Sequence, residues 1–128
     1  MSAKKPTILL VEDDRLISRA YEIGMKHEGF DMLVAYDGSE AMAILKEKQP
    51  DVILLDLIMP NKNGFDVLTE LKADERLKAI PVIVLSNLGQ DADIVRGKEL
   101  GAVDYLIKSD LSISDVVLKV HTYLDRKK

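Results

Sequence analysis

The sequence predicts an α/β domain in which helices cover both faces of a parallel sheet. Four short runs rich in Ile, Val and Leu lie far enough apart for a helix between them: Ile8 to Val11, Val52 to Leu55, Val82 to Leu85 and Tyr105 to Ile107. Such runs are typical of strands buried on both faces, as in parallel sheets. Each run stops at a polar residue. The carboxyl ends of the strands should therefore share one polar edge, where open α/β sheets bind ligands.

Composition supports one compact domain spanning residues 1–128. A chain of 128 residues can bury roughly two thirds of its unfolded surface. Its net charge is -4, from 18 Lys and Arg against 22 Asp and Glu, which is not the basic footprint of a protein that binds nucleic acid directly. The absence of cysteine excludes disulfides, thiolate zinc sites and cysteine nucleophiles.

No segment suggests export or membrane insertion. The basic start, Met1 to Pro6, precedes only a short apolar run that is cut off by acids, which is not the pattern of a signal peptide. No stretch approaches the roughly 18 apolar residues of a membrane span. We expect a cytoplasmic protein.

The first helix is predicted after Asp13 and Asp14. Asp14 suits the cap position, because a carboxylate there accepts hydrogen bonds from free backbone amides. The apolar stripe of this helix consists of Leu16, Ile17, Ala20, Tyr21, Gly24 and Met25, and Gly29 ends it. A strand from Met32 to Ala35 follows.

Capping signals mark the next two helices. Asp37 to Glu40 has capping-box spacing, and Pro50 closes the segment, which buries Ala41, Ile44 and Leu45. The third helix is predicted to start at Asn63 and to bury Phe65, Leu68 and Leu71.

The last two helices differ in quality. The fourth, near Asp91 to Leu100, contains Gly97, which costs about 1 kcal/mol relative to Ala. The fifth opens at a capping box, Ser112 to Asp115, and its inner face carries Ile113, Val116, Val117, Val120 and Leu124. We predict that the fourth helix is the least stable of the five, as a switching element must be.

Reactive side chains follow four of the strands: Glu12, Asp13 and Asp14, then Asp56, Ser86 and Lys108. Taken singly, each has an ordinary explanation as a helix cap, a turn residue or a lysine that reaches solvent. Taken together at one sheet edge, they predict a site.

The acids favour phosphoryl chemistry with a metal. Glu12, Asp13 and Asp56 would repel one another without a cation, and Mg2+ is the hard ion that works with a few carboxylates, water and a phosphate. A carboxylate can also form an aspartyl phosphate. Asp56 stands alone at its strand end and is the best nucleophile. Lys108 supplies a point charge for a phosphate oxygen, and Ser86 supplies a hydroxyl donor.

Four segments closely resemble the receiver domain of bacterial two-component response regulators, the CheY-like family: Val11 to Asp14, Leu54 to Pro60 with Gly64, Val84 to Asn87, and Asp104 to Lys108. The resemblance covers residues 6 to 125. It implies a flavodoxin-like (βα)5 fold with strand order 2-1-3-4-5. It also implies that Asp56 accepts a phosphoryl group from a sensor histidine kinase or a phosphotransfer protein.

The resemblance assigns further roles. It places Mg2+ on Glu12, Asp13, Asp56 and the backbone carbonyl of Ile58, and phosphoryl contacts on Ser86 and Lys108. Ser86 and Tyr105 are the implied switch residues, which couple the site to a surface of the fourth helix, fifth strand and fifth helix, where an unknown protein target binds. The implied activity is a signalling switch that promotes its own phosphoryl transfer and slow autodephosphorylation, and acts on no separate substrate.

Four positions bear on how this site behaves. Ser109 follows Lys108 where the family usually has a proline after a cis bond, so we expect a trans peptide. Asn87 replaces a small residue. Ile58 and Leu88 flank the family's path for the attacking water, and neither can form a hydrogen bond with it, which predicts a long-lived phosphorylated form.

Competing functions fit less well. A haloacid dehalogenase phosphatase would need an acid at Ile58, and a nucleotide binder needs phosphate-cradling amides where the first turn carries acids. A phosphorylation-independent pseudo-receiver remains the alternative, although every reactive residue is present. Neither His27 nor His121 lies at a strand end, so the phosphoryl donor must be another molecule.

Overall fold

The computed structural model describes residues 5–126, so the predicted domain limits at residues 1 and 128, and the start Met1 to Lys4, lie outside the described residues. Strands and helices alternate along the chain: β1 (Thr7–Val11), α1 (Arg15–His27), β2 (Asp31–Ala35), α2 (Gly38–Leu45), β3 (Val52–Leu55), α3 (Gly64–Ala73), β4 (Val82–Ser86), α4 (Asp91–Glu99), β5 (Asp104–Ile107) and α5 (Ile113–Arg126). A short 3-10 turn, Lys108–Asp110, joins β5 to α5. Each predicted strand is present, with ends within one residue of the prediction.

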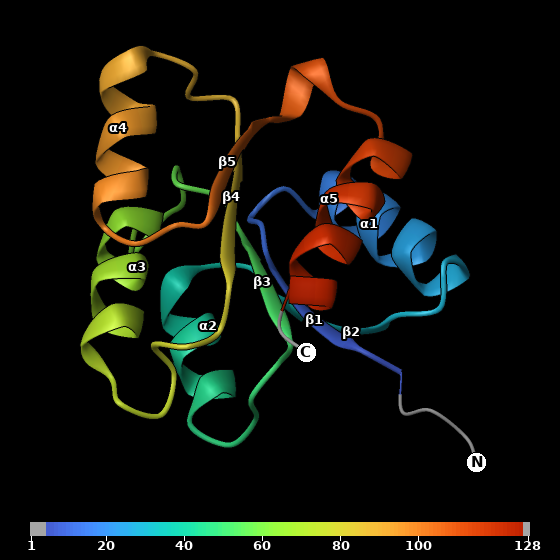
Figure 1. Cartoon of the computed structure of the whole chain (residues 1–128), viewed down its shortest axis with the longest axis horizontal. Coiled ribbons are helices and arrows are strands. Elements are labelled where there is room, and N and C mark those ends of the chain that lie inside the picture. The colour runs from blue at the N-terminus through green and yellow to red at the C-terminus, as the bar shows by residue number, and fades with distance from the viewer. Residues whose placement is uncertain (1–4, 127–128) are drawn as a thin grey trace.

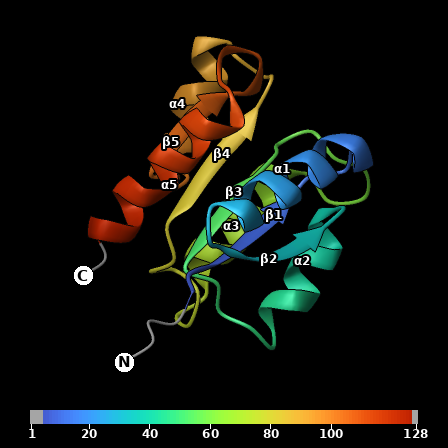
Figure 2. The ribbon, with the colours of Figure 1, turned by 90° about the vertical axis from the view of Figure 1, so that its right-hand side faces the viewer.

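The sheet is parallel and has the strand order β2-β1-β3-β4-β5, which confirms the predicted topology. Helices α1 and α5 cover one face, and α2, α3 and α4 cover the other (Figure 1). Figure 2 looks onto the α1 and α5 layer. Because side chains alternate along a strand, Ile8 and Leu10 of β1 belong to the core between the sheet and helices α1 and α5. Leu9 and Val11 belong to the core on the opposite face, under α2, α3 and α4. All four are buried, as two covered faces require.

The register brings the ends of the strands together. Val11 of β1 lies opposite Leu55 of β3, so the residues that follow them leave the sheet at the same edge. Ser86 ends β4 opposite Ile107 of β5, directly before Lys108. The side chains that the sequence singled out therefore start from neighbouring points of one sheet edge.

The predicted caps of four helices are confirmed. Asp14 accepts hydrogen bonds from the amides of Leu16 and Ile17, and Asp37 and Asn63 each accept one from the third residue on. At α5 the capping box is reciprocal: the Ser112 amide donates to Asp115, and the Asp115 amide donates to the Ser112 hydroxyl. Gly29 follows α1 with a φ of 96°, the left-handed conformation that ends many helices.

Several apolar residues lie nearer to solvent than predicted. Leu16 and Ala20 were placed on the inner stripe of α1, but both are exposed, and the Leu16 side chain is 85% exposed. Phe65 is only half-buried on α3, and the Arg96 guanidinium of α4 lies 4.0 Å from its ring centroid. Helical periodicity indicates which face a residue occupies, but it does not indicate how far the neighbouring layer extends.

The structure also bears on the membrane prediction. Within residues 5–126, no helix is both long and apolar enough to cross a membrane.

Candidate functional site

Three carboxylates gather where β1 and β3 end. Glu12, Asp13 and Asp56 each offer an oxygen atom, and these oxygens lie within 4.8 Å of one another. The Glu12 and Asp56 side chains are buried, while Asp13 is exposed at the rim. The cluster that the sequence predicted is therefore present, with its two buried members contributed by neighbouring strands.

Lys108 reaches this cluster from the end of β5. Its Nζ atom contacts Glu12 Oε1 and lies 3.1 Å from Asp56 Oδ2. The lysine side chain is only 11% exposed. The sequence predicts a metal ion that relieves the repulsion among the three carboxylates. The Lys108 ammonium already relieves part of that repulsion. Three carboxylates against one ammonium still leave two negative charges when all four groups are ionised.

Burial and the ion pairs shape the titration of this group. Burial raises the pKa of Glu12, and the charge of Asp56 adds to this effect, against the lowering by Lys108 and the Asp14 amide. Burial lowers the pKa of Lys108, but its bonds and charge interactions with Glu12 and Asp56 outweigh that effect, and the net pKa is raised. The lysine therefore stays charged at neutral pH.

Backbone amides fix the orientation of the two buried acids. Asp56 Oδ1 accepts hydrogen bonds from the Leu57 amide at 2.7 Å and the Ile58 amide at 3.3 Å, which leaves Oδ2 toward Lys108. Glu12 Oε2 accepts from the Asp14 amide at 3.0 Å. Gly64 allows α3 to begin against this loop, because a Cβ there would lie 2.3 Å from the Asp56 carbonyl oxygen.

Ser86 and Tyr105 each form a hydrogen bond with the backbone of Leu88. The Ser86 side chain is fully buried, and its hydroxyl accepts a hydrogen bond from the Leu88 amide at 3.3 Å. The Tyr105 hydroxyl donates to the Leu88 carbonyl. The Tyr105 ring is buried beneath α4, where a Cβ on Gly97 would lie 3.0 Å from it. Burial, with smaller effects from Asp93 and Asp56, raises the pKa of Tyr105 to about 12.

The loops around the site contain one contact that the sequence did not reveal. Asn87 Oδ1 accepts a hydrogen bond from the Ser109 amide at 3.0 Å, which joins the loop after β4 to the loop after β5. The sequence shows both residues only as separate departures from the family pattern. The peptide bond between Lys108 and Ser109 is trans, like all those between described residues, which confirms that prediction.

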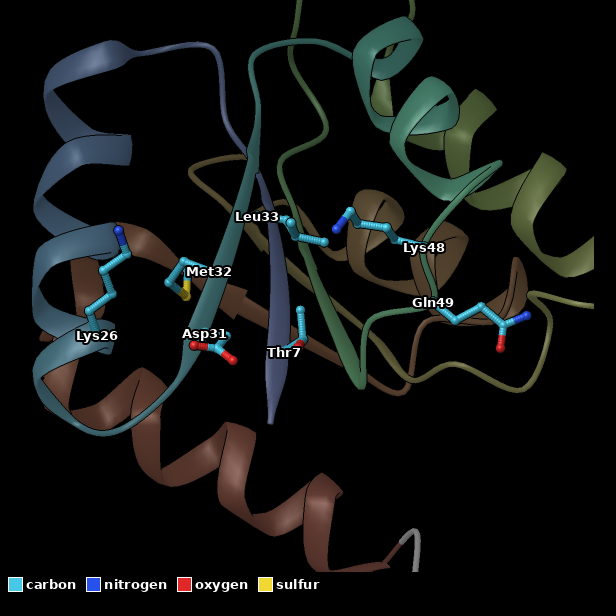
Figure 3. A pocket seen from close by; sticks show the side chains of 7 residues that line it. All are labelled: Thr7, Lys26, Asp31, Met32, Leu33, Lys48 and Gln49. Atoms are coloured by element: carbon cyan, nitrogen blue, oxygen red, sulfur yellow. The ribbon is translucent and has the colours of Figure 1, made fainter. Parts of the chain in front are cut away.

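A hollow of about 600 Å3 lies elsewhere on the molecule (Figure 3). It is lined by Thr7, Lys26, Asp31, Met32, Leu33, Lys48 and Gln49. Thr7 and Asp31 begin β1 and β2, so the hollow sits at the amino ends of these strands, away from the acid cluster. Lys26 is already paired with Glu22 at 3.3 Å. The candidate site is therefore the cluster at the carboxyl edge of the sheet.

Known proteins are similar to this chain in sequence and in fold. The family model of the response regulator receiver domain matches residues 8–120. The DNA-binding dual master transcriptional regulator RpaA of Synechocystis sp. is 39% identical over 121 residues, which are 94% of this chain and 50% of that protein. Among solved structures, the receiver domain of Francisella response regulator 1452 has a TM-score of 0.89 at 31% identity, and the match covers 97% of this chain and 100% of that one. The Mn2+-bound form of response regulator Rcp1 has a TM-score of 0.79 at 35% identity, covering 91% of this chain and 90% of that one.

The extent of these matches settles the family. The chain spans about half the length of the curated relatives it matches, and nearly the whole of the solved receiver domains. The family match runs from β1 into α5 and includes every strand end described above. The chain belongs to the CheY-like response regulator receiver domains and is a phosphoryl-accepting receiver of two-component signalling.

Proposed function

We propose that Asp56 is the phosphoryl acceptor, and that its donor is a phosphohistidine of a sensor histidine kinase or of a phosphotransfer protein. The observation that carries this assignment is the contact of one ammonium, on Lys108, with both Glu12 and Asp56. This assignment is supported by three strand ends that bring the Asp56 carboxylate beside a positive charge that suits a phosphoryl oxygen.

The chemistry follows from how Asp56 is held. Oδ1 is engaged by two backbone amides, so Oδ2 attacks. A bond forms between Oδ2 and phosphorus while the bond from phosphorus to the donor imidazole nitrogen breaks, and the electron pair stays on that nitrogen. Lys108 shifts its contact to an oxygen of the incoming group, and the Ser86 hydroxyl donates to another once it releases the Leu88 amide.

The acid cluster fits a hard divalent cation. Its donors are carboxylate oxygens, and two negative charges remain after Lys108 is counted. We assign Glu12, Asp13, Asp56 and the Ile58 backbone carbonyl as the residues that hold Mg2+. Bound Mg2+ would neutralise negative charge on the phosphoryl oxygens. The pseudo-receiver alternative finds no support, and the side chains proposed for the reaction are all present in the chain.

The output follows the path from Ser86 to Tyr105. Both side chains bond to Leu88, so movement of Ser86 toward the phosphoryl group changes the contact that keeps Tyr105 under α4. We propose that this alters the surface of α4, β5 and α5, where an unidentified protein target binds.

Residues 1–128 act as one receiver domain in the cytoplasm, and with a net charge of -4 they make no direct contact with nucleic acid.

The test is phosphorylation by acetyl phosphate, followed by intact mass. We expect one phosphoryl adduct in the presence of Mg2+, none with a chelator, and none on Asp56→Asn. Asp125→Asn, at an exposed acid of α5, is the matched control and should be modified like the wild type. An adduct on Asp56→Asn, or equal modification in chelator, would disprove the assignment.

We also propose that autodephosphorylation is slow. The Ile58 side chain is 59% exposed beside Asp56, Leu88 is half-buried, and neither can hold a water molecule by a hydrogen bond. Loss of such positioning commonly costs a factor of about 10 to 100 in rate.

The double variant Ile58→Asn, Leu88→Glu should therefore lose its phosphoryl group faster than the wild type in the same Mg2+ buffer. The apolar double variant Ile58→Leu, Leu88→Ile should retain the slow rate. If the polar variant is no faster than the wild type, another feature sets the lifetime.

A further inference from the structure

Two residues that depart from the family pattern contact each other in the folded protein. The Asn87 side chain accepts a hydrogen bond from the backbone amide of Ser109, 22 positions further along the chain. A proline at position 109 has no amide hydrogen, so this contact depends on both residues at once. Asn87 and Ser109, which the sequence shows as two separate departures from the family pattern, therefore form one hydrogen-bonded pair in the structure.

The pair is placed to control Lys108. Ser109 is the middle residue of the turn Lys108–Asp110, and the amides at the start of such a turn have no partner within it. Asn87 satisfies one of them from the neighbouring loop. Because Ser109 directly follows Lys108, this bond fixes the backbone from which the lysine side chain reaches Asp56.

The loop on the other side of the bond is itself anchored to the site. The Leu88 amide donates to the hydroxyl of Ser86, the last residue of β4, and the Leu88 carbonyl accepts a hydrogen bond from the Tyr105 hydroxyl. Asn87, between Ser86 and Leu88, therefore connects the segment next to one proposed phosphoryl-contacting group, Ser86, to the segment next to the other, Lys108.

We propose that Asn87 is a positioning residue, which acts through the Ser109 amide to hold Lys108 where it contacts the phosphoryl group on Asp56. This inference rests on the proposed function. Asn87 and Ser109 are exposed, and neither is a ligand of the proposed metal site. The pair should consequently affect phosphoryl acceptance without affecting Mg2+ binding.

Bulk provides the competing explanation. An asparagine near the entrance of the site could simply obstruct the phosphodonor, and a smaller residue would then speed the reaction. Asn87→Leu keeps a branched side chain with the same number of non-hydrogen atoms and removes the acceptor oxygen, whereas Asn87→Ala removes both the bulk and the oxygen. Ser109→Pro removes the amide hydrogen, and Ser109→Ala keeps the amide while deleting the side-chain hydroxyl, so it serves as the matched control.

The experiment measures the rate of acetyl phosphate modification by intact mass, and Mg2+ affinity by calorimetry, on the whole chain. Asn87→Leu, Asn87→Ala and Ser109→Pro should each slow modification by about fivefold, the equivalent of one net hydrogen bond. Their Mg2+ affinities and those of Ser109→Ala should equal that of the wild type. Ser109→Ala should also react at the wild-type rate.

The double variant Asn87→Leu, Ser109→Pro decides whether the two residues act together. If they do, it should react no more slowly than Ser109→Pro alone, because the same bond is already lost. The positioning role would be overturned if the rate losses of the two single variants multiplied in the double variant. It would also be overturned if Asn87→Ala reacted faster than the wild type, or if the Asn87 variants reacted at the wild-type rate. In those cases the wild type is still modified on Asp56. A wild type without that adduct would instead refute the proposed function and this inference with it.

Discussion

Helices α4 and α5 lie on opposite faces of the sheet beside β5 (Figure 1), and they are attached to it in contrasting ways. Helix α5 begins at a reciprocal capping box and buries Val116, Val117 and Val120. Helix α4 follows Gln90, whose side chain gives the helix start no hydrogen bond. Of the α4 residues, all of which the structure describes, only Gly97 is buried.

The few contacts of α4 connect it to Tyr105 of β5 and to Phe65 of α3. Gly97 brings the helix against the Tyr105 ring, and the Arg96 guanidinium stacks on Phe65 of α3. Gly97 therefore costs local helix stability but allows this close approach. Because Tyr105 also bonds to the loop after Ser86, a small change near the phosphorylation site reaches a weakly held helix, while α5 stays anchored.

The largest expected difference comes from the same substitution in the two helices. Val120→Ala should lower the free energy of unfolding by about 2 kcal/mol, because it removes two fully buried methyl groups and leaves a cavity. Val95→Ala in α4, at a side chain that is 52% exposed, should change it by less than about 0.5 kcal/mol. Urea unfolding of the two variants provides the measurement. Equal losses would mean that α4 is packed as firmly as α5.

The next difference should appear in amide exchange. We expect the amides of α4 to exchange at least about tenfold faster than those of α5, and fastest among the five helices, because few buried contacts oppose local opening. Binding of a beryllofluoride phosphoryl mimic should change the exchange in α4 more than in α5. Uniform protection across all five helices would contradict this view of α4 as the switching element.

The sequence was sufficient for the sheet and for the charged residues of the site. The strands follow from buried apolar runs, and their order follows from the resemblance to the receiver family. Runs that end at the same edge bring Glu12, Asp56 and Lys108 together. Local signals also work at short range, as the caps at Asp14 and Ser112 show. These features depend on hydrophobic periodicity and on residues that are close together in the chain, both of which can be read from the sequence.

Contacts between loops were beyond the reach of the sequence. The bond between Asn87 and Ser109 depends on the path of two loops, and no periodic pattern encodes such a path. The ion pairs of Lys108 were missed for a related reason, because its position was predicted but its resting partners were not. The exposure of Leu16 shows the same limit, since helical periodicity alone does not determine how far a side chain is buried.

The smallest expected effect concerns the hydroxyl that connects Tyr105 to Leu88. Tyr105→Phe keeps the ring against Gly97 but removes the donor to the Leu88 carbonyl, which should cost about 1 kcal/mol of unfolding free energy at pH 8. The pKa of Tyr105 is raised to about 12, so the folded state favours its protonated form. That stabilisation is complete below the ordinary tyrosine pKa of about 10, and it is lost as the pH rises through 12.

The stability difference between wild type and Tyr105→Phe should therefore narrow above pH 10, although other groups destabilise both proteins there. Comparing the two proteins at each pH cancels those shared effects, and urea unfolding from pH 8 to 11 covers the start of the window. A difference that stays constant over this range would show that ionisation of Tyr105 is not linked to folding. A Tyr105→Phe variant as stable as the wild type at pH 8 would mean that the hydroxyl adds nothing to the attachment of α4, which would then depend on its other contacts, including those of Ile94, Arg96 and Gly97.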